Sequence, residues 1–167
     1  MSWTIARIEA ADIDEVAAVH VRVWQEAYAG LMPADYLASL DPVAFAAGWR
    51  SRLADQDPRV HTRVARDDAG VVGIATWGPS RDDDAPTPYE LYAINVLARG
   101  HGTGVADGLL AETIGGRAAM LWVVDGNARA MAFYRRHGFA DEGGRKPEPR
   151  TGVLEVRMSR GPVGGRA

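Results

Sequence analysis

The residues best suited to chemistry lie in the stretch RGHGTGVADGLL, residues 99–110, which holds four glycines just before an apolar, helix-like run. Backbone N–H groups at a helix start lack partners within the helix, and the helix dipole adds partial positive charge there. Glycines let a phosphate approach such groups without interference from a Cβ atom. The stretch predicts a phosphate site whose N–H donors come from Gly102, Thr103, Gly104, Val105 and Ala106.

Two classes of phosphate-bearing ligand use turns of this kind. A dinucleotide turn would be Gly102-x-Gly104-x-x-x-Gly108, with Asp125 about 20 residues later. That fold normally begins with the turn and continues through several further strand–helix units. Here about 100 residues precede the turn, and too few follow Asp125 to build the second half. The surroundings therefore disfavour a dinucleotide.

A second stretch, NARAMAFYRRHGF, covers residues 127–139. Asn127 stands at an expected helix start, where its side chain either caps the helix or hydrogen-bonds a ligand. Phe133 is expected in the core. Tyr134 has two interpretations: a general acid beside a leaving group, or an interfacial tyrosine with its hydroxyl in water.

Together the two stretches resemble the GNAT superfamily of N-acetyltransferases. The first is similar to the family's acetyl-CoA motif, Q/R-x-x-G-x-G/A, and fits it in two registers, from Arg99 or from His101. We favour the register from His101, since it keeps the customary five-residue gap after Val96, although the family usually has Gln or Arg at this position. The second stretch matches the family pattern N-x-x-A-x-x-F-Y-x-x-x-G-F without a gap.

The resemblance implies acetyl-CoA as cosubstrate, with its pantetheine arm beside the strand that precedes the glycine motif. The Val96 N–H would then polarise the thioester carbonyl, and Tyr134 would protonate the departing CoA thiolate. The cofactor-binding residues implied are Asn95, Val96, Leu97, His101, Gly102, Thr103, Gly104, Val105, Ala106, Asn127 and Tyr134.

The acceptor side of the site is less well defined. Glu90, on the same strand as Val96, is the expected base for the amine, acting through water; the alternative is an edge carboxylate facing solvent. Trp24 and Tyr28 share one helical face and either line the acceptor pocket or pack onto the sheet. The acidic run at residues 82–84 either attracts a cationic substrate or is a solvated loop.

Hydrophobic periodicity predicts the elements that position these residues. Strands are expected at 3–9, 60–66, 71–77, 89–97, 119–124, from 139 onward, and at 153–158; helices are expected at 12–28, 33–53 with a break near 41–42, 103–117 and 127–137. With the resemblance, this order predicts an α/β GNAT fold, a mixed central sheet of about six or seven strands flanked by about four helices. We expect one domain over residues 1–160 and a disordered tail at 161–167.

Composition excludes several functional classes. A formal net charge of -3 gives no electrostatic case for nucleic acid, and no apolar run is long enough to cross a membrane. The absence of cysteine excludes disulfides, thiolate zinc sites and a cysteine acyl-enzyme. The histidines show no metal-ligand spacing. We therefore expect a cytoplasmic protein without metal, membrane or nucleic-acid partners, and a homodimer only by analogy.

The function predicted is direct transfer of an acetyl group from acetyl-CoA to a primary amine of a small molecule or a peptide N-terminus. The alternative is a non-catalytic acyl-CoA-binding regulatory module, which would bind acetyl-CoA without releasing CoA. The identity of the acceptor and the use of other acyl-CoAs stay open at this point, because no motif in the acceptor region specifies them.

Overall fold

The computed structural model of the protein describes residues 2–55 and 57–163. Its strands are β1 (Thr4–Arg7), β2 (His61–Asp67), β3 (Gly70–Pro79), β4 (Tyr89–Val96), β5 (Ala119–Val124), β6 (Ala140–Pro147) and β7 (Leu154–Arg160). Its α-helices are α1 (Ile13–Ala27), α2 (Ala34–Ala38), α3 (Pro42–Ala54), α4 (Val105–Glu112) and α5 (Ala128–Arg136). The predicted order of strands and helices is confirmed.

The largest difference in bounds concerns α4, which is shorter than the helix expected over 103–117. Gly104 precedes it with a φ of 86°, a left-handed conformation that stops the helix from starting earlier. At the other end the Thr113 hydroxyl donates to the Leu109 carbonyl at 2.7 Å, and Gly115 has a φ of 53°. Side-chain competition and left-handed glycines therefore set both ends.

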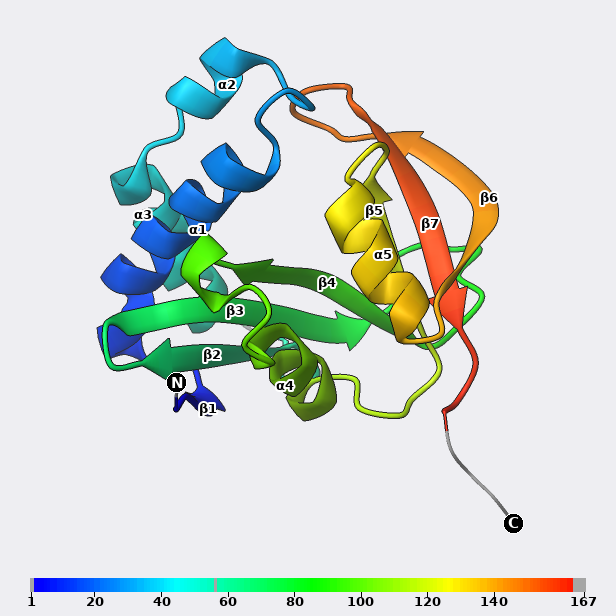
Figure 1. The fold of residues 1–167 in the computed structure, drawn as a ribbon, viewed down its shortest axis with the longest axis horizontal. Helices are drawn as coiled ribbons and strands as arrows, with labels where there is room; N and C mark the ends of the chain where they lie inside the picture. Colours follow the sequence, from blue (N-terminus) through cyan, green and yellow to red (C-terminus); the bar gives the residue numbers. More distant parts are fainter. Residues whose placement is uncertain (1, 56, 164–167) are drawn as a thin grey trace.

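The seven strands form one mixed sheet in the order β1-β2-β3-β4-β5-β7-β6. All neighbours are antiparallel except β4 and β5, which are parallel and pair at one position, Glu90 with Met120. That position lies near the start of both strands. In Figure 1, β4 runs across the view, whereas β5 and β7 lie at a steep angle to β4. The sheet therefore opens between the carboxyl ends of β4 and β5.

A β-bulge in β4 accompanies this opening. Thr76 of β3 lies opposite Ala93, but the next residue, Trp77, lies opposite Leu91, so Tyr92 is an extra residue in β4. A bulge bends its strand and increases the local twist. The bend fits the divergence of β4 from β5.

Helices cover both faces of the sheet. A Cβ atom on Gly73 of β3 would lie 2.9 Å from Leu109 of α4, whereas the next residue, Ile74, lines a pocket with Trp24 of α1 and Trp49 of α3. Successive residues of a strand point to opposite faces, so α1 and α3 lie on one face and α4 on the other (Figure 1). Helix α5 joins α4 in a second apolar cluster over β5 and β7.

The segment that follows β7 packs back onto the residues between α4 and β5. Strand β7 ends at Arg160, and beyond it the Val163 N–H donates to the Gly116 carbonyl at 2.8 Å. The rest of the expected tail, residues 164–167, lies outside the described residues. Within the described part of the chain, no helix is long and apolar enough to cross a membrane.

Candidate active site

The opening between β4 and β5 exposes the backbone of Val96. The Leu97 N–H donates to the Val72 carbonyl at 2.9 Å, and Val96 lies opposite Gly73 in the same antiparallel register. Successive residues of a strand direct their N–H groups to opposite sides, so the Val96 N–H points away from β3 and into the opening. The expectation that Leu97 pairs with a ligand there is wrong, because its N–H is used by β3. The same alternation turns the backbone of Asn95 toward β3.

The glycine turn lies at the end of this opening. Gly102 and Gly104 both have positive φ values, 76° and 86°. The first helical bond of α4 runs from the Gly108 N–H to the Gly104 carbonyl at 2.9 Å, so the N–H groups of Val105 and Ala106 precede the hydrogen-bond ladder. The Thr103 hydroxyl donates to the Gly100 carbonyl at 2.8 Å and holds the turn in shape. The Thr103 N–H donates to the same carbonyl at 3.4 Å, so the expectation that it is free for a phosphate is wrong. This arrangement is suited to a phosphate ester.

Two nearby side chains distinguish the two motif registers. The Arg99 guanidinium donates to Asp67 at 3.0 Å and to the Val71 carbonyl at 2.8 Å, so it is held against the β2–β3 turn. A ring nitrogen of His101 lies 3.0 Å from the Val96 carbonyl, and the ring also contacts the Arg129 guanidinium of α5. His101 therefore lies at the opening itself and Arg99 does not, which favours the register from His101.

Helix α5 brings Asn127 and Tyr134 to the other side of the opening. The Asn127 side-chain oxygen accepts a hydrogen bond from the Ala130 N–H at 3.2 Å, so the capping interpretation is confirmed. Tyr134 is 7% exposed, and no group in the described part of the chain hydrogen-bonds its hydroxyl. Burial, and to a smaller extent the nearby Tyr28, raise the pKa of Tyr134, so the phenol keeps its proton at neutral pH.

A cavity of about 610 Å³ lies on the α1 and α3 face of the sheet, next to Val96. Its floor is formed by sheet residues that include Ile74, Ala93 and Asn95. Trp24 lines it, as one interpretation expected, whereas Tyr28 packs its ring against Trp24 with a centroid separation of 5.3 Å and lies outside the lining. Burial raises the pKa of Tyr28 to about 12. Tyr28 is therefore a packing residue.

Glu90 lies beside this cavity in an unexpected state. Its side chain is 1% exposed, so it does not face solvent. Both carboxylate oxygens accept hydrogen bonds from Arg81: the guanidinium donates at 2.5 and 3.1 Å and the backbone N–H at 3.0 Å. A carboxylate held in this way is poorly placed to take a proton from an amine. The geometry favours a positioning role for Glu90 over the expected role as base.

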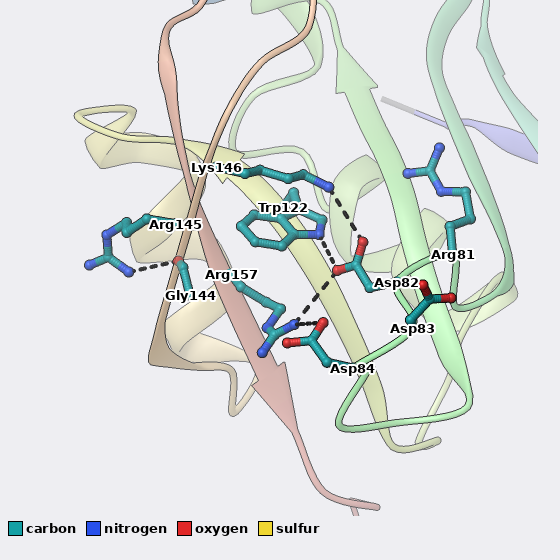
Figure 2. A pocket seen from close by; sticks show the side chains of 9 residues that line it. All are labelled: Arg81, Asp82, Asp83, Asp84, Trp122, Gly144, Arg145, Lys146 and Arg157. Atoms are coloured by element: carbon teal, nitrogen blue, oxygen red, sulfur yellow. Dashed lines mark hydrogen bonds and ion pairs between the residues drawn. The ribbon is translucent and has the colours of Figure 1, made fainter.

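The acidic run forms part of a second cavity, of about 520 Å³, shown in Figure 2. Asp82 accepts a hydrogen bond from the Trp122 indole at 2.8 Å and lies 3.5 Å from the Lys146 ammonium. Asp84 accepts one from Arg157 at 2.9 Å. Two of the three carboxylates are thus paired with cations of β6 and β7, and one of them also accepts a hydrogen bond from β5. The run ties its loop to the sheet, which disfavours a role in attracting cationic substrates.

His20 of α1 lies among aromatic rings at the edge of the acceptor cavity. Its ring contacts Phe45 with a centroid separation of 4.9 Å, and the Trp49 indole N–H donates to its Nδ1 at 3.3 Å. Burial, assisted by the charges of Arg52 and Arg150, lowers the pKa of His20 from 6.5 to about 4. The imidazole is therefore neutral at pH 7.

This shift predicts an acid sensitivity of the fold. Between pH 6.5 and 4 the unfolded chain binds a proton at His20 that the folded chain does not, so the free energy of unfolding falls as the pH is lowered. The expected loss from this group between pH 7 and 4.5 is about 2–3 kcal/mol. Urea unfolding of the wild type and of His20→Gln at both pH values tests it. Equal acid sensitivity of the two proteins would refute the assignment.

Sequence reasoning missed the cations around the acceptor cavity. Arg52 of α3, Arg81 and Arg150 all line it. Arg52 follows Trp49 by three residues on one helix, a spacing that signals a shared face. Arg150 belongs to the β6–β7 connection, and nothing in its local sequence links it to α1 or α3.

Comparison with known proteins identifies the family to which the chain belongs. The family model of the acetyltransferase (GNAT) domain matches residues 58–141. The chain is 32% identical over 141 residues to the uncharacterized N-acetyltransferase YuaI of Bacillus subtilis (strain 168), covering 80% of this chain and 78% of that protein.

Solved structures share the fold at lower identity. The PaiA N-acetyltransferase of Thermoplasma acidophilum, crystallised in complex with coenzyme A, superposes with a TM-score of 0.71 at 18% identity, over 96% of this chain and 99% of that one. A ribosomal-protein-alanine N-acetyltransferase of Brucella melitensis superposes with a TM-score of 0.67 at 22% identity, over 94% of this chain and 98% of that one. With the sequence matches, these likenesses establish that the chain belongs to the GNAT superfamily of N-acetyltransferases and is an acyltransferase.

Proposed function

We propose that this enzyme transfers an acetyl group from acetyl-CoA directly to a primary amine. The observation that carries the proposal is the opening between β4 and β5: the Val96 N–H points into it, the glycine turn lies at its end, and the acceptor cavity adjoins it through Asn95. A thioester carbonyl in the opening would meet an unused backbone donor, and an amine could reach it from the cavity.

The residues present fit acetyl-CoA. Its pyrophosphate would be held by the N–H groups of Gly102, Gly104, Val105 and Ala106, with the helix dipole of α4 behind them. The pantetheine arm would lie beside Val96, between β4 and α5. His101, with Arg129 against its ring, borders this path. Bound acetyl-CoA supplies an activated acetyl group as a thioester.

Two groups of the chain act in the transfer. The amine nitrogen forms a bond to the acetyl carbon while the Val96 N–H stabilises negative charge on the carbonyl oxygen. The carbon–sulfur bond then breaks and the Tyr134 hydroxyl donates its proton to the thiolate. The nitrogen gives up its remaining extra proton as the amide forms, and the Tyr134 phenolate regains a proton through water. The acceptor ammonium loses its first proton before the attack, and because Glu90 is held by Arg81, this proton leaves to water in the open cavity. CoA and the acetylated amine are the products.

A screen for CoA release tests this function. Acetyl-CoA is offered with a panel of polyamines, amino acids, aminoglycosides and peptides with free N-termini, and free thiol is measured alongside acetyl-CoA binding. We expect tight binding and release of CoA with at least one class of amine. Binding without release from any amine would support the alternative, a regulatory module that binds acyl-CoA. Failure to bind acetyl-CoA would refute both.

Glu90 gives a second prediction about this site. If the carboxylate positions Arg81, Glu90→Gln and Arg81→Gln should lower kcat/KM by a similar factor of about 5–20, and the double variant should lose no more than either single one. A catalytic base would behave differently: Glu90→Gln alone would lower kcat and flatten the acid limb of the pH profile. Steady-state kinetics from pH 6 to 9 distinguish the two outcomes.

A further inference from the structure

The floor of the acceptor cavity carries a buried polar side chain without a partner. Asn95 is 8% exposed, and its side chain lines the cavity on the face opposite to the CoA helix α4. Among residues 2–55 and 57–163 its amide has no hydrogen-bond partner. The amide lines the cavity with its donors and its acceptor unused by the protein, so it can hydrogen-bond a polar group of a ligand there. Because Asn95 adjoins Val96, that ligand group lies next to the reacting carbonyl.

The mouth of the same cavity carries two arginines from distant parts of the chain. Arg52 lies over the Trp49 ring at 5.2 Å, and Arg150 lies over the Trp24 ring at 5.7 Å. Neither guanidinium forms an ion pair or hydrogen bond with any described residue. Both rings line the cavity, so each guanidinium is held at its wall by stacking.

These two cations lie close enough to affect one another. Partial burial and the charge of Arg150 lower the pKa of Arg52, and both charges act on His20. Of the other charged residues that line the cavity, Arg81 pairs with Glu90 at 2.5 Å and Asp57 with Arg59 at 2.6 Å, while Asp55 accepts a hydrogen bond from the Ser51 hydroxyl at 3.4 Å and forms no ion pair with Arg52 or Arg150. Two like charges that no acid pairs repel each other unless an anion lies between them. The arrangement therefore favours an anionic group at the mouth.

We propose that the acceptor is a small primary amine that carries a carboxylate, with its amine at Asn95 and its carboxylate between Arg52 and Arg150. The inference rests on the proposed acetyl transfer and names the substrate class of that site. A guanidinium binds a carboxylate through two parallel hydrogen bonds, and two of them satisfy both oxygens. Between the two ends the wall is apolar, with Trp24, Leu53 and Ile74, so the acceptor has an apolar body. An apolar amino acid has these three parts.

Matched sets of three amines test the proposal. Each set shares one carbon skeleton: an amino acid, its amide and its decarboxylated amine, for leucine, methionine and phenylalanine. We expect kcat/KM for the acid to exceed that of its amide by at least about 10-fold in at least one set. The amide loses its ammonium proton more readily, so intrinsic reactivity favours the amide and the expected order is opposite. An amide also represents a peptide N-terminus.

Variants of the two arginines complete the test. Arg52→Gln and Arg150→Gln should each lower kcat/KM for the acid by about 10-fold and change it for the amide by less than about twofold. Arg50→Gln is the matched control, because Arg50 lies on the same helix and pairs with Asp14 at 2.6 Å. It should leave the ratio of acid to amide unchanged. A general loss of folding would move both substrates together and leave that ratio intact.

Failure of the carboxylate proposal can be distinguished from failure of the acetyl-transfer proposal. If amides or decarboxylated amines react as well as the acids in every set, or if only other amines release CoA, the carboxylate proposal is wrong while the acetyl-transfer proposal stands. If neither these sets nor the broad panel releases CoA, the acetyl-transfer proposal fails first. If the acid is preferred but both arginine variants keep the preference, the assignment to Arg52 and Arg150 is wrong.

Discussion

Replacing Tyr134 with phenylalanine should lower kcat by at least about 100-fold while acetyl-CoA binding changes by less than about twofold. The phenol lies on α5 at the edge of the opening between β4 and β5, and burial keeps it protonated by raising its pKa. Loss of the hydroxyl removes the donor for the departing thiolate and leaves the ring in place. The effect therefore falls on the chemical step.

Steady-state kinetics with calorimetric titration of acetyl-CoA check this result. Tyr89→Phe is the matched control, since that tyrosine begins β4, at the end of the strand opposite to Val96, and packs its ring against Trp77 with a centroid separation of 5.5 Å. It should keep kcat within about twofold. A raised KM with unchanged kcat would place Tyr134 in binding, and full activity of Tyr134→Phe would exclude it as the acid.

The fold could be predicted largely because its elements carry local signals. Asn127 caps the start of α5, and Gly138, with a φ of 85°, follows the end of this helix. Both ends of α5 can therefore be predicted from residue types alone. Strand β5 is a short buried run rich in β formers. The bulge at Tyr92 carries no such signal, because it arises from the pairing of β4 with β3. The opening between β4 and β5 therefore cannot be read from the residues of either strand.

The cofactor side of the site was also more predictable than the acceptor side. Its donors are backbone groups in one continuous stretch, and the residue type of Gly102 and Gly104 predicts the positive φ values found there. The acceptor cavity combines α1, α3, β4 and the β6–β7 connection, so Arg52 and Arg150 meet across 98 positions of sequence. Which N–H groups of β4 face the opening depends on strand register, and the register is not readable from the strand alone. The ion pair of Glu90 could not be predicted for a related reason: its partner, Arg81, lies across a loop.

The register of β4 leads to the second large effect. Because the Val96 N–H points away from β3, Val96→Pro should remove the donor to the thioester carbonyl without breaking a sheet hydrogen bond. We expect kcat to fall by about 100- to 1000-fold with the fold intact. Leu97→Pro is the contrasting variant, since it removes the bond to the Val72 carbonyl at 2.9 Å. It should instead lower the free energy of unfolding by about 1–3 kcal/mol.

Two further measurements separate donor loss from other damage. Val96→Ala keeps the N–H and removes side-chain volume, so it should retain kcat within about fivefold. Coenzyme A binding to Val96→Pro reports whether the opening still accepts the pantetheine arm. If Val96→Pro binds coenzyme A, unfolds like the wild type and still keeps more than about a tenth of kcat, the Val96 N–H does not stabilise the transition state. The polarising group would then have to lie elsewhere along the opening, and the backbone of Ile94, the preceding β4 residue in the same phase, would be the next to test.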